Sequence, residues 1–310
     1  MVNVRPLNDE LQKKAIKELN EDPERIPKDL ETFREWIKKS PHIKCFDDDQ
    51  FLINFLRGCK FSMERVKQKF DLYHTLKTHI PELTRNRDPL DEKVLGAIRQ
   101  AVGIPLPHTD GPDGPRYFLV RPGNYNPSEY SITDIIKVST MINDLMMLED
   151  DNFVIAGSIG ILDFTGTSMS HFLQFNPTFI KQMTMIQQDA NPIRQKGSHF
   201  VNMPSIALTV FNIFQSFTNE KNKKRVFVHG HDMESLYKSI PRKLLPKEYG
   251  GEAGTIEEIA KDVEKRLIAR RDFFLEDEKF GVDEKKRVGR PKNPESLFGI
   301  EGSFRQLAID

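Results

Sequence analysis

The sequence has few cysteines and no long apolar segment. Only Cys45 and Cys59 occur among its 310 residues, so the chain has no disulfide framework, and without a CxxC pair we expect neither a zinc site nor a redox motif. Mean hydropathy is −0.52, and no apolar run approaches the ~18 residues of a transmembrane helix. The first ten residues lack the apolar core of a signal peptide. We therefore expect a reduced, cytoplasmic setting.

Net charge is absent as well. The 46 Lys and Arg residues balance the 46 Asp and Glu residues, which argues against a nucleic-acid partner. Residues 287–292 (RVGRPK) are similar to a minor-groove AT-hook, but one imperfect copy in a neutral chain does not change that expectation. The aromatic content is uneven, with 22 Phe against 1 Trp and 6 Tyr. A soluble chain must bury most of this Phe.

Common catalytic motifs are missing too. The chain contains no GxxxxGK[ST], no GxGxxG after a predicted strand, no GxSxG and no HExxH. Asp163 and His171 would suit a hydrolase, but a carboxylate that caps the following turn is the favoured interpretation of Asp163. His229, Gly230 and His231 could suggest a metal site, but two histidines alone do not make up a metal-binding motif. We predict no catalytic residue, no cofactor and no metal.

The first hundred residues predict amphipathic helices. Pro27 suits a first helical position, and apolar residues follow it at helical spacing. Aspartates before residue 50 are cap candidates for a helix over 49–56, and Ser62 is one for a helix over 63–73. These segments predict a small helical bundle, which we assign to residues 1–95.

After a Pro- and Gly-rich turn at 105–115 the pattern becomes α/β. Strands are predicted within 117–120, 159–162, 199–202 and 225–229, and helices of 10–15 residues separate them. Ser131 and Asp134 form a capping-box pair before one of these helices. Short strands alternating with helices indicate βαβ units and a mainly parallel sheet, which we assign to residues 96–252.

Residues 253–310 form a third segment. A charged amphipathic helix is predicted over 256–267. The charged stretch 283–293 is expected to be mobile, and the Phe and Leu residues of 297–307 are expected to dock back on the fold.

The helix predicted from Pro204 to Thr218 is almost wholly apolar. Its few polar residues are small and form one stripe at i, i+4, i+7 and i+11, namely Ser205, Thr209, Asn212 and Ser216. Such a helix is either a buried crossover helix or a wall that covers an apolar cavity and can meet a membrane. The pattern alone leaves both possibilities open.

Two groups of cations flank this helix. Arg194 and Lys196 precede one predicted strand, and Lys221 and Arg225 precede the next. If these strands are neighbours, the cations gather at one edge, where they would suit an anionic lipid head group. Ordinary solvated surface is the alternative.

Four segments resemble the CRAL-TRIO lipid-binding family. Residues 49–61 (DQFLINFLRGCKF) resemble its N-terminal helical signature, and 160–166 (GILDFTG) resemble the strand and turn of its lipid-binding domain. Residues 191–204 (NPIRQKGSHFVNMP) are similar to the family run P-x-(R/K)-x-(K/R)-G-x-H-x-x-N-x-P, and 244–251 (LLPKEYGG) to its closing LPxEYGG. The segments occur in the family order, and the members that carry tocopherol or retinaldehyde are the most similar.

The resemblance implies an α/β fold with an N-terminal helical bundle, followed by a CRAL-TRIO sandwich that has a mainly parallel sheet, an apolar pocket and a helical lid over 205–217. It implies a monomeric intracellular carrier that exchanges its ligand at phosphoinositide-containing membranes, in transient peripheral contact with them. Tocopherol, a retinoid, a carotenoid, a sterol or a phospholipid would each suit the pocket class. A lipid-sensing scaffold that recruits a protein through the tail beyond Asp283 is the alternative function.

The resemblance also implies site residues. Those for the phosphoinositide head group are Arg194, Lys196, Lys221 and Arg225. Cys59 replaces an arginine of the family signature, which weakens the case for a further phosphate contact from the helical region. Gln187 and Gln195 are more polar than their counterparts in tocopherol carriers, which argues against tocopherol itself. The implied pocket residues are Ile136, Ser139, Ile142, Asn143, Leu162, Met183, Ile186, Gln187, Ile193, Val210, Phe211 and Phe214.

Overall fold

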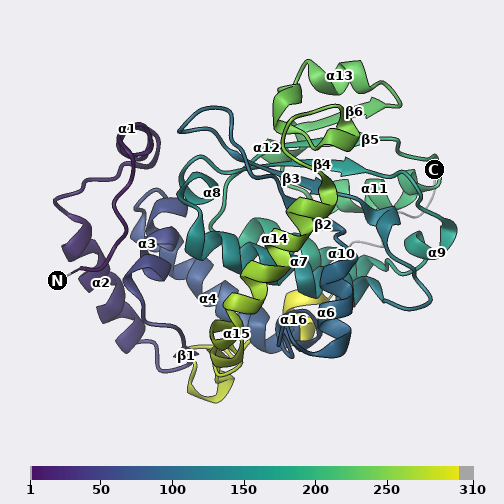
Figure 1. The fold of residues 1–310 in the computed structure, drawn as a ribbon. Coiled ribbons are helices and arrows are strands. Elements are labelled where there is room, and N and C mark those ends of the chain that lie inside the picture. Colours follow the sequence, from purple (N-terminus) through teal and green to yellow (C-terminus); the bar gives the residue numbers. More distant parts are fainter. Residues whose placement is uncertain (1, 300–310) are drawn as a thin grey trace.

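The N-terminal part of the chain is helical, as predicted. A computed structural model describes residues 2–299 of the protein (Figure 1). Asp48 caps one predicted helix by accepting from the Phe51 amide at 2.9 Å. The helices of this part are α1 (Asp9–Leu19), α2 (Ile26–Lys38), α3 (Asp49–Gly58), α4 (Met63–His79), α5 (Pro81–Thr84) and α6 (Glu92–Arg99).

A five-stranded sheet follows. Its order is β2-β3-β4-β5-β6; β2 runs antiparallel to β3, and the remaining neighbours are parallel. The predicted mainly parallel α/β fold is therefore confirmed. The short edge strand β2 was not predicted, because three residues beside a proline-rich turn carry no alternation. The strands are β2 (Gly103–Pro105), β3 (Arg116–Val120), β4 (Ser158–Asp163), β5 (Gln195–Val201) and β6 (Val226–Gly230).

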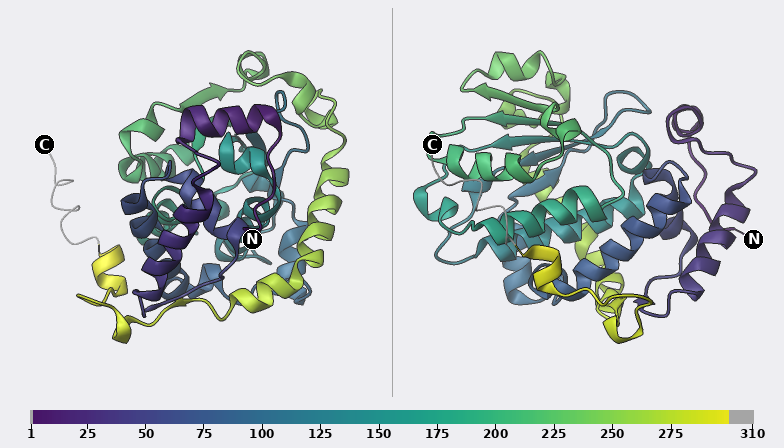
Figure 2. Two further views of the ribbon diagram at one scale, coloured as in Figure 1. Left: turned by 90° about the vertical axis from the view of Figure 1, so that its left-hand side faces the viewer. Right: turned by 180° about the vertical axis from the view of Figure 1, so that it is seen from behind.

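Helices cover both faces of the sheet (Figures 1 and 2). On one face lie α13 (Met233–Tyr237) and α14 (Ile256–Ala269), which pack against Tyr117 and Ile161. On the other lie α7 (Ile132–Glu149), α10 (Pro177–Thr184), which continues as a π-helix over Met185–Ala190, and α11 (Ala207–Phe217). The capping box of Ser131 and Asp134 begins α7, as predicted. Short elements complete this part of the chain: a 3-10 turn (Pro122–Asn124), α8 (Asp151–Ile155), α9 (Met169–Phe172), α12 (Glu220–Lys223) and two further 3-10 turns (Arg242–Leu244 and Lys247–Tyr249).

The C-terminal segment returns to the helical part. After α15 (Arg271–Asp277), strand β7 (Gly281–Val282) pairs antiparallel with β1 (Ile43–Lys44). Helix α16 (Pro294–Phe298), drawn in yellow in Figure 2, follows. Its buried Phe298 packs into the cluster that contains α10 residues. The predicted docking of the tail holds for Phe298, while residues 300–307 of that prediction lie outside the described residues.

The expectation that residues 283–293 are mobile is wrong. This stretch forms a 3-10 turn (Glu284–Lys286), and two of its cations bind the carboxylate of Asp71 on α4. The Asp71 oxygens lie 2.6 Å from Arg287 Nη1, 2.5 Å from Lys292 Nζ and 2.8 Å from His42 Nε2. Local composition suggested solvated charge, but the partner carboxylate lies more than 200 residues earlier. Arg287 and Lys292 of the AT-hook-like motif are therefore engaged in ion pairs within the protein.

A buried ion network joins the parts of the chain. Arg87 binds Asp144 of α7 at 2.7 Å and also binds Asp277 at the end of α15. Lys77 of α4 is a second partner of Asp277. All four side chains are nearly inaccessible to solvent. Since removing one member of such a network leaves uncompensated buried charge, the network ties α4, α7 and α15 together.

Candidate functional site

The two faces of the sheet are packed differently. On the face toward α13 and α14, Tyr117, Leu119 and Ile161 are at most 4 % exposed. Their neighbours along the same strands, Phe118 and Leu162, point to the opposite face and remain only half-buried, as do Val120 and Phe200. The side chains between the sheet and helices α7, α10 and α11 are therefore apolar but less fully covered than those on the other face; a hydrophobic ligand site would be lined in this way.

Helix α7 places its four predicted pocket residues along this region. Ile142 is buried in the core, while Ile136, Ser139 and Asn143 are half-buried. The Asn143 side-chain oxygen accepts from Asn191 Nδ2 at 2.7 Å, whereas its own Nδ2 has only the Met147 sulfur at 3.7 Å. Asn143 thus has an amide donor with a weak partner at the edge of the apolar region.

Helix α10 and its π-helical continuation supply a second wall. Met183 is buried and Ile186 half-buried in one apolar cluster, which Ile136 and Phe214 join. Gln187, in contrast, is exposed. The end of the π-helix is held by Lys69 of α4, whose ammonium lies 3.0, 2.7 and 3.0 Å from the carbonyl oxygens of residues 188, 189 and 191. π-helical turns are frequent at functional sites.

The remaining predicted pocket residues are divided. Phe211 of α11 packs edge-on against Phe200 at 5.2 Å between ring centroids, and Phe214 packs against Phe175 at 6.1 Å. Val210 and Leu162 are half-buried. Ile193 instead joins the cluster around α1 and α8 as well as the main core.

Helix α11 is apolar yet poorly buried. Within α11, all of which is described, only Ala207 is buried, and Leu208 is 46 % exposed. The polar stripe Ser205, Thr209, Asn212 and Ser216 faces solvent. The interpretation of this segment as a fully buried crossover helix is therefore wrong. An apolar helix that covers half-buried apolar side chains of the sheet and keeps its polar stripe in solvent has the arrangement expected of a lid.

The cations predicted for the head group gather at one edge of the sheet. Because β5 and β6 are neighbours, the Ser198 amide donates to the Arg225 carbonyl at 2.9 Å, next to Arg194 and Lys196. Burial and the nearby charges of Arg225, Lys60 and Arg194 lower the pKa of Lys221. We call Arg194, Lys196, Lys221 and Arg225 the cationic patch.

Sequence reasoning missed three charged residues at this patch. Glu18 of α1 lies 2.9 Å from Arg194 Nη1 and 3.5 Å from Lys196 Nζ. Lys60 and Arg65 follow α3 and add to the positive potential at Lys221. Gly58 lies so close to the Pro192 carbonyl that a Cβ there would overlap it, which holds the α3–α4 turn beside the patch. Lys60 follows Cys59 in the family-like segment 49–61 and could have been found there. No local signal in the sequence marks Glu18.

Asp163 and His171 are each engaged by other groups. Asp163 accepts from Tyr249 Oη at 2.5 Å, from Asn202 Nδ2 at 2.9 Å and from Thr165 N at 3.0 Å. Burial acts to raise the pKa of Asp163, but these hydrogen bonds outweigh it and hold the pKa below its usual value. His171 uses both ring nitrogens on Ser168 and on the Tyr125 carbonyl. The favoured interpretation of Asp163 as a turn cap is confirmed, because the Thr165 amide is one of its donors.

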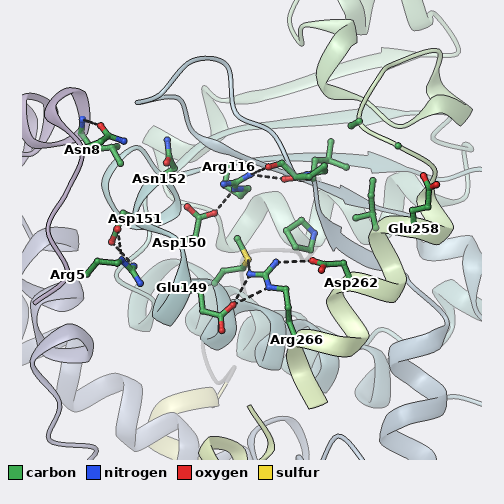
Figure 3. Close-up of a pocket in the computed structure, with 18 residues that line it drawn as sticks. Arg5, Asn8, Arg116, Glu149, Asp150, Asp151, Asn152, Glu258, Asp262 and Arg266 are labelled. Carbon is green, nitrogen blue, oxygen red and sulfur yellow. Dashed lines mark hydrogen bonds and ion pairs between the residues drawn. The ribbon is translucent and has the colours of Figure 1, made fainter. Parts of the chain in front are cut away.

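A separate groove of about 720 Å³ lies between the N-terminal segment, α8 and α14 (Figure 3). It contains none of the predicted pocket residues. Its three arginines are each paired with a carboxylate, Asp262 lies 3.6 Å from Arg266 as well, and Glu258 accepts from the Thr255 amide at the start of α14. The pairs are Arg5–Asp151 at 2.7 Å, Arg116–Asp150 at 2.5 Å and Arg266–Glu149 at 3.1 Å.

Metal-binding clusters and membrane-spanning helices are absent from residues 2–299. No group of three or more His, Cys, Asp and Glu side chains in that range is arranged to hold a metal ion. In the same range, no helix combines the length and apolar character needed to cross a membrane.

Known families and proteins match most of the chain. The CRAL/TRIO domain matches residues 102–251, and the Pinta-like UBA domain matches residues 22–94. "Alpha-tocopherol transfer protein-like" from Homo sapiens is 34 % identical over 272 residues, which are 87 % of this chain and 78 % of that protein. "Clavesin-2" from Rattus norvegicus is 26 % identical over 246 residues, 79 % of this chain and 75 % of that one. The crystal structure of Sfh5 aligns with 87 % of this chain and 99 % of its own, at 14 % identity and a TM-score of 0.46.

The sequence segments, the matched domain and the relatives "Alpha-tocopherol transfer protein-like" and "Clavesin-2" agree. The alignment with the 34 % identical human protein covers 87 % of this chain and 78 % of that protein. The similarity therefore extends well beyond the four short motifs. The protein belongs to the CRAL/TRIO family.

Proposed function

We propose that the protein is a monomeric, cytoplasmic carrier that binds one hydrophobic small molecule or lipid between the sheet and helices α7, α10 and α11. It delivers and collects this ligand at phosphoinositide-containing membranes. The observation that supports the proposal most is the half-buried apolar face of the sheet, with Phe118, Leu162 and Phe200, beneath an apolar helix that is itself poorly buried. The names of the relatives, one of them a tocopherol transfer protein-like chain, favour the same class of function.

Affinity in such a site comes from apolar burial. Each Å² of apolar ligand surface removed from water contributes about 25 cal/mol, less the cost of immobilising the ligand. Orientation requires a few polar groups. Ser139 and the weakly partnered amide of Asn143 are suited to bind a hydroxyl or carbonyl group of the ligand.

Exchange requires that α11 move. Opening would expose Phe211 and Phe214, which only a membrane or re-closure can cover. A polyanionic head group on the cationic patch, which adjoins α11 through α12, would favour the open state if it binds that state more tightly. The membrane would then both trigger opening and receive the ligand.

The first test identifies the ligand. The purified protein is analysed by native mass spectrometry, and the bound molecule is extracted and identified. A single hydrophobic species at one copy per chain is expected. A protein that carries no such species, and that takes up none of the five candidate classes when they are offered in vesicles, would refute the carrier function.

The second test addresses the membrane. Lys221→Ala with Arg225→Ala should abolish the acceleration of ligand transfer by phosphoinositide in acceptor vesicles. The matched control is Lys261→Ala with Lys265→Ala, which removes the same charge from exposed positions of α14 on the opposite face of the sheet. If phosphoinositide accelerates transfer equally in both variants, the cationic patch is not the membrane contact.

A further inference from the structure

An acidic side chain occupies half of the cationic patch. Glu18 pairs with Arg194 at 2.9 Å and with Lys196 at 3.5 Å. Lys221 and Arg225, the other half, form no ion pair with any carboxylate of residues 2–299. The patch is thus divided into a half in which one carboxylate offsets part of two positive charges, and a free half without a carboxylate, in which Arg225 donates to the Gln195 carbonyl.

Glu18 is held in place by the packing of its helix. Leu11, Ala15 and Leu19 of α1 are buried, and they pack in one cluster with Val154 and Ile155 of α8. Glu18 lies on the same helix, next to Leu19, with its side chain 35 % exposed. The carboxylate is therefore presented to the patch by a fixed helix.

The partner arginine is fixed as well. Arg194 is only 13 % exposed; its Nη1 donates to Glu18 and its Nη2 to the Ile155 carbonyl, while its Nε is buried without a partner. Hydrogen bonding from Arg194 and the charge of Lys196 outweigh burial and hold the pKa of Glu18 below its usual value. At neutral pH a full negative charge thus lies beside Arg194 and Lys196, where the phosphate of a bound anion would otherwise lie.

We propose that Glu18 sets the phosphate-number selectivity of the cationic patch. One phosphate of a head group binds the free half, at Lys221 and Arg225. A second phosphate reaches Arg194 and Lys196 only by displacing the Glu18 carboxylate, so Glu18 reduces the advantage of a doubly phosphorylated inositol head group over a singly phosphorylated one. This inference rests on the proposed binding of phosphoinositides by the patch.

The test measures binding to phosphatidylcholine vesicles that contain either a singly or a doubly phosphorylated phosphatidylinositol. Glu18→Gln keeps the side-chain shape and removes the charge. Since two partly exposed ion pairs are released, we expect the affinity for the doubly phosphorylated lipid to rise about five- to thirtyfold. The affinity for the singly phosphorylated lipid should rise less than about threefold.

Two controls isolate the effect. Glu10→Gln removes the same charge from an exposed position of α1, where Glu10 pairs with Lys13, and should leave both affinities unchanged. In a variant that already carries Arg194→Gln and Lys196→Gln, adding Glu18→Gln should not raise the affinity for the doubly phosphorylated lipid further, because the two cations that Glu18 pairs with are absent. Thermal unfolding of each variant establishes that α1 stays docked.

The outcomes separate this inference from the proposed function. If the wild-type protein binds neither phosphoinositide better than plain phosphatidylcholine, both are overturned. If the wild-type protein binds but Glu18→Gln behaves like Glu10→Gln, only the role of Glu18 is overturned. Soluble inositol phosphates should reproduce the selectivity change, since Glu18 competes for the head group; a change seen only with vesicles would also overturn it.

Discussion

The uneven packing of the sheet makes a direct prediction for Leu162. Leu162 is half-buried on the face toward α7 and α11, next to Ile161, which is fully buried on the face toward α14. Leu162→Trp places a larger ring among the half-buried apolar side chains of the proposed ligand site. The change in the free energy of unfolding should be less than about 1 kcal/mol, and the ligand should be excluded.

The matched control is Ile161→Trp, one residue away on the same strand. Its surroundings are close-packed, so the larger ring must displace buried neighbours, which costs about 1–3 kcal/mol or more. At about 2–4 °C per kcal/mol, as in domains of 150–250 residues, the melting temperature should fall by several degrees. The two variants differ only in the face of the sheet that receives the same side chain.

Thermal unfolding and native mass spectrometry together give the result. Leu162→Trp should melt near the wild-type temperature without bound ligand, whereas Ile161→Trp should melt lower and still carry it. Equal destabilisation by the two substitutions would mean that both faces are packed core. A stable Leu162→Trp variant that still carries ligand would place the ligand elsewhere.

Three further predictions concern stability. Asp277→Ala leaves Lys77 and Arg87 buried without their shared carboxylate, so the free energy of unfolding measured in denaturant should fall by roughly 3–5 kcal/mol. Burial, followed by a neighbouring histidine, lowers the pKa of His199 to about 4. The unfolded chain takes up this proton near pH ~6.5, so the free energy of unfolding should fall as the pH is lowered from ~6.5 to about 4, by at most ~1.4 kcal/mol per pH unit for this group. In His199→Gln the urea concentration at the unfolding midpoint should therefore depend less on pH across that range. Phe298→Ala should release α16, and hydrogen exchange should rise in α16 and in α10, against which it packs; unchanged exchange in α10 would contradict a supporting role of the tail.

Local patterns in the sequence were sufficient for most of the fold. The capping box of Ser131 and Asp134 marks the start of α7, and the alternation of strands and helices gives the parallel sheet. These signals operate within one or two turns of chain, where neighbouring side chains and backbone groups decide the structure. The family resemblance added the lid, whose solvent-facing stripe agrees with an apolar helix that is held by one side.

The contacts that shape the candidate site were not predictable in this way. Glu18 meets Arg194 across 176 residues, and no local feature of α1 distinguishes Glu18 from other glutamates. Lys292 looks like solvated charge in its own segment and finds Asp71 only through the tertiary fold. Such pairs depend on the relative position of whole elements, which hydrophobic periodicity does not specify.

The pairing of β1 with β7 has a consequence for how the protein is made. Lys44 meets Gly281, so the helical region receives its second strand only after more than 230 further residues have left the ribosome. At about 5–20 residues per second this takes roughly 12–50 s, during which Asp71 and Lys77 also lack their C-terminal partners. The earliest part of the chain to emerge is thus among the last to be completed, and a nascent chain stalled before the tail should need a chaperone to stay soluble.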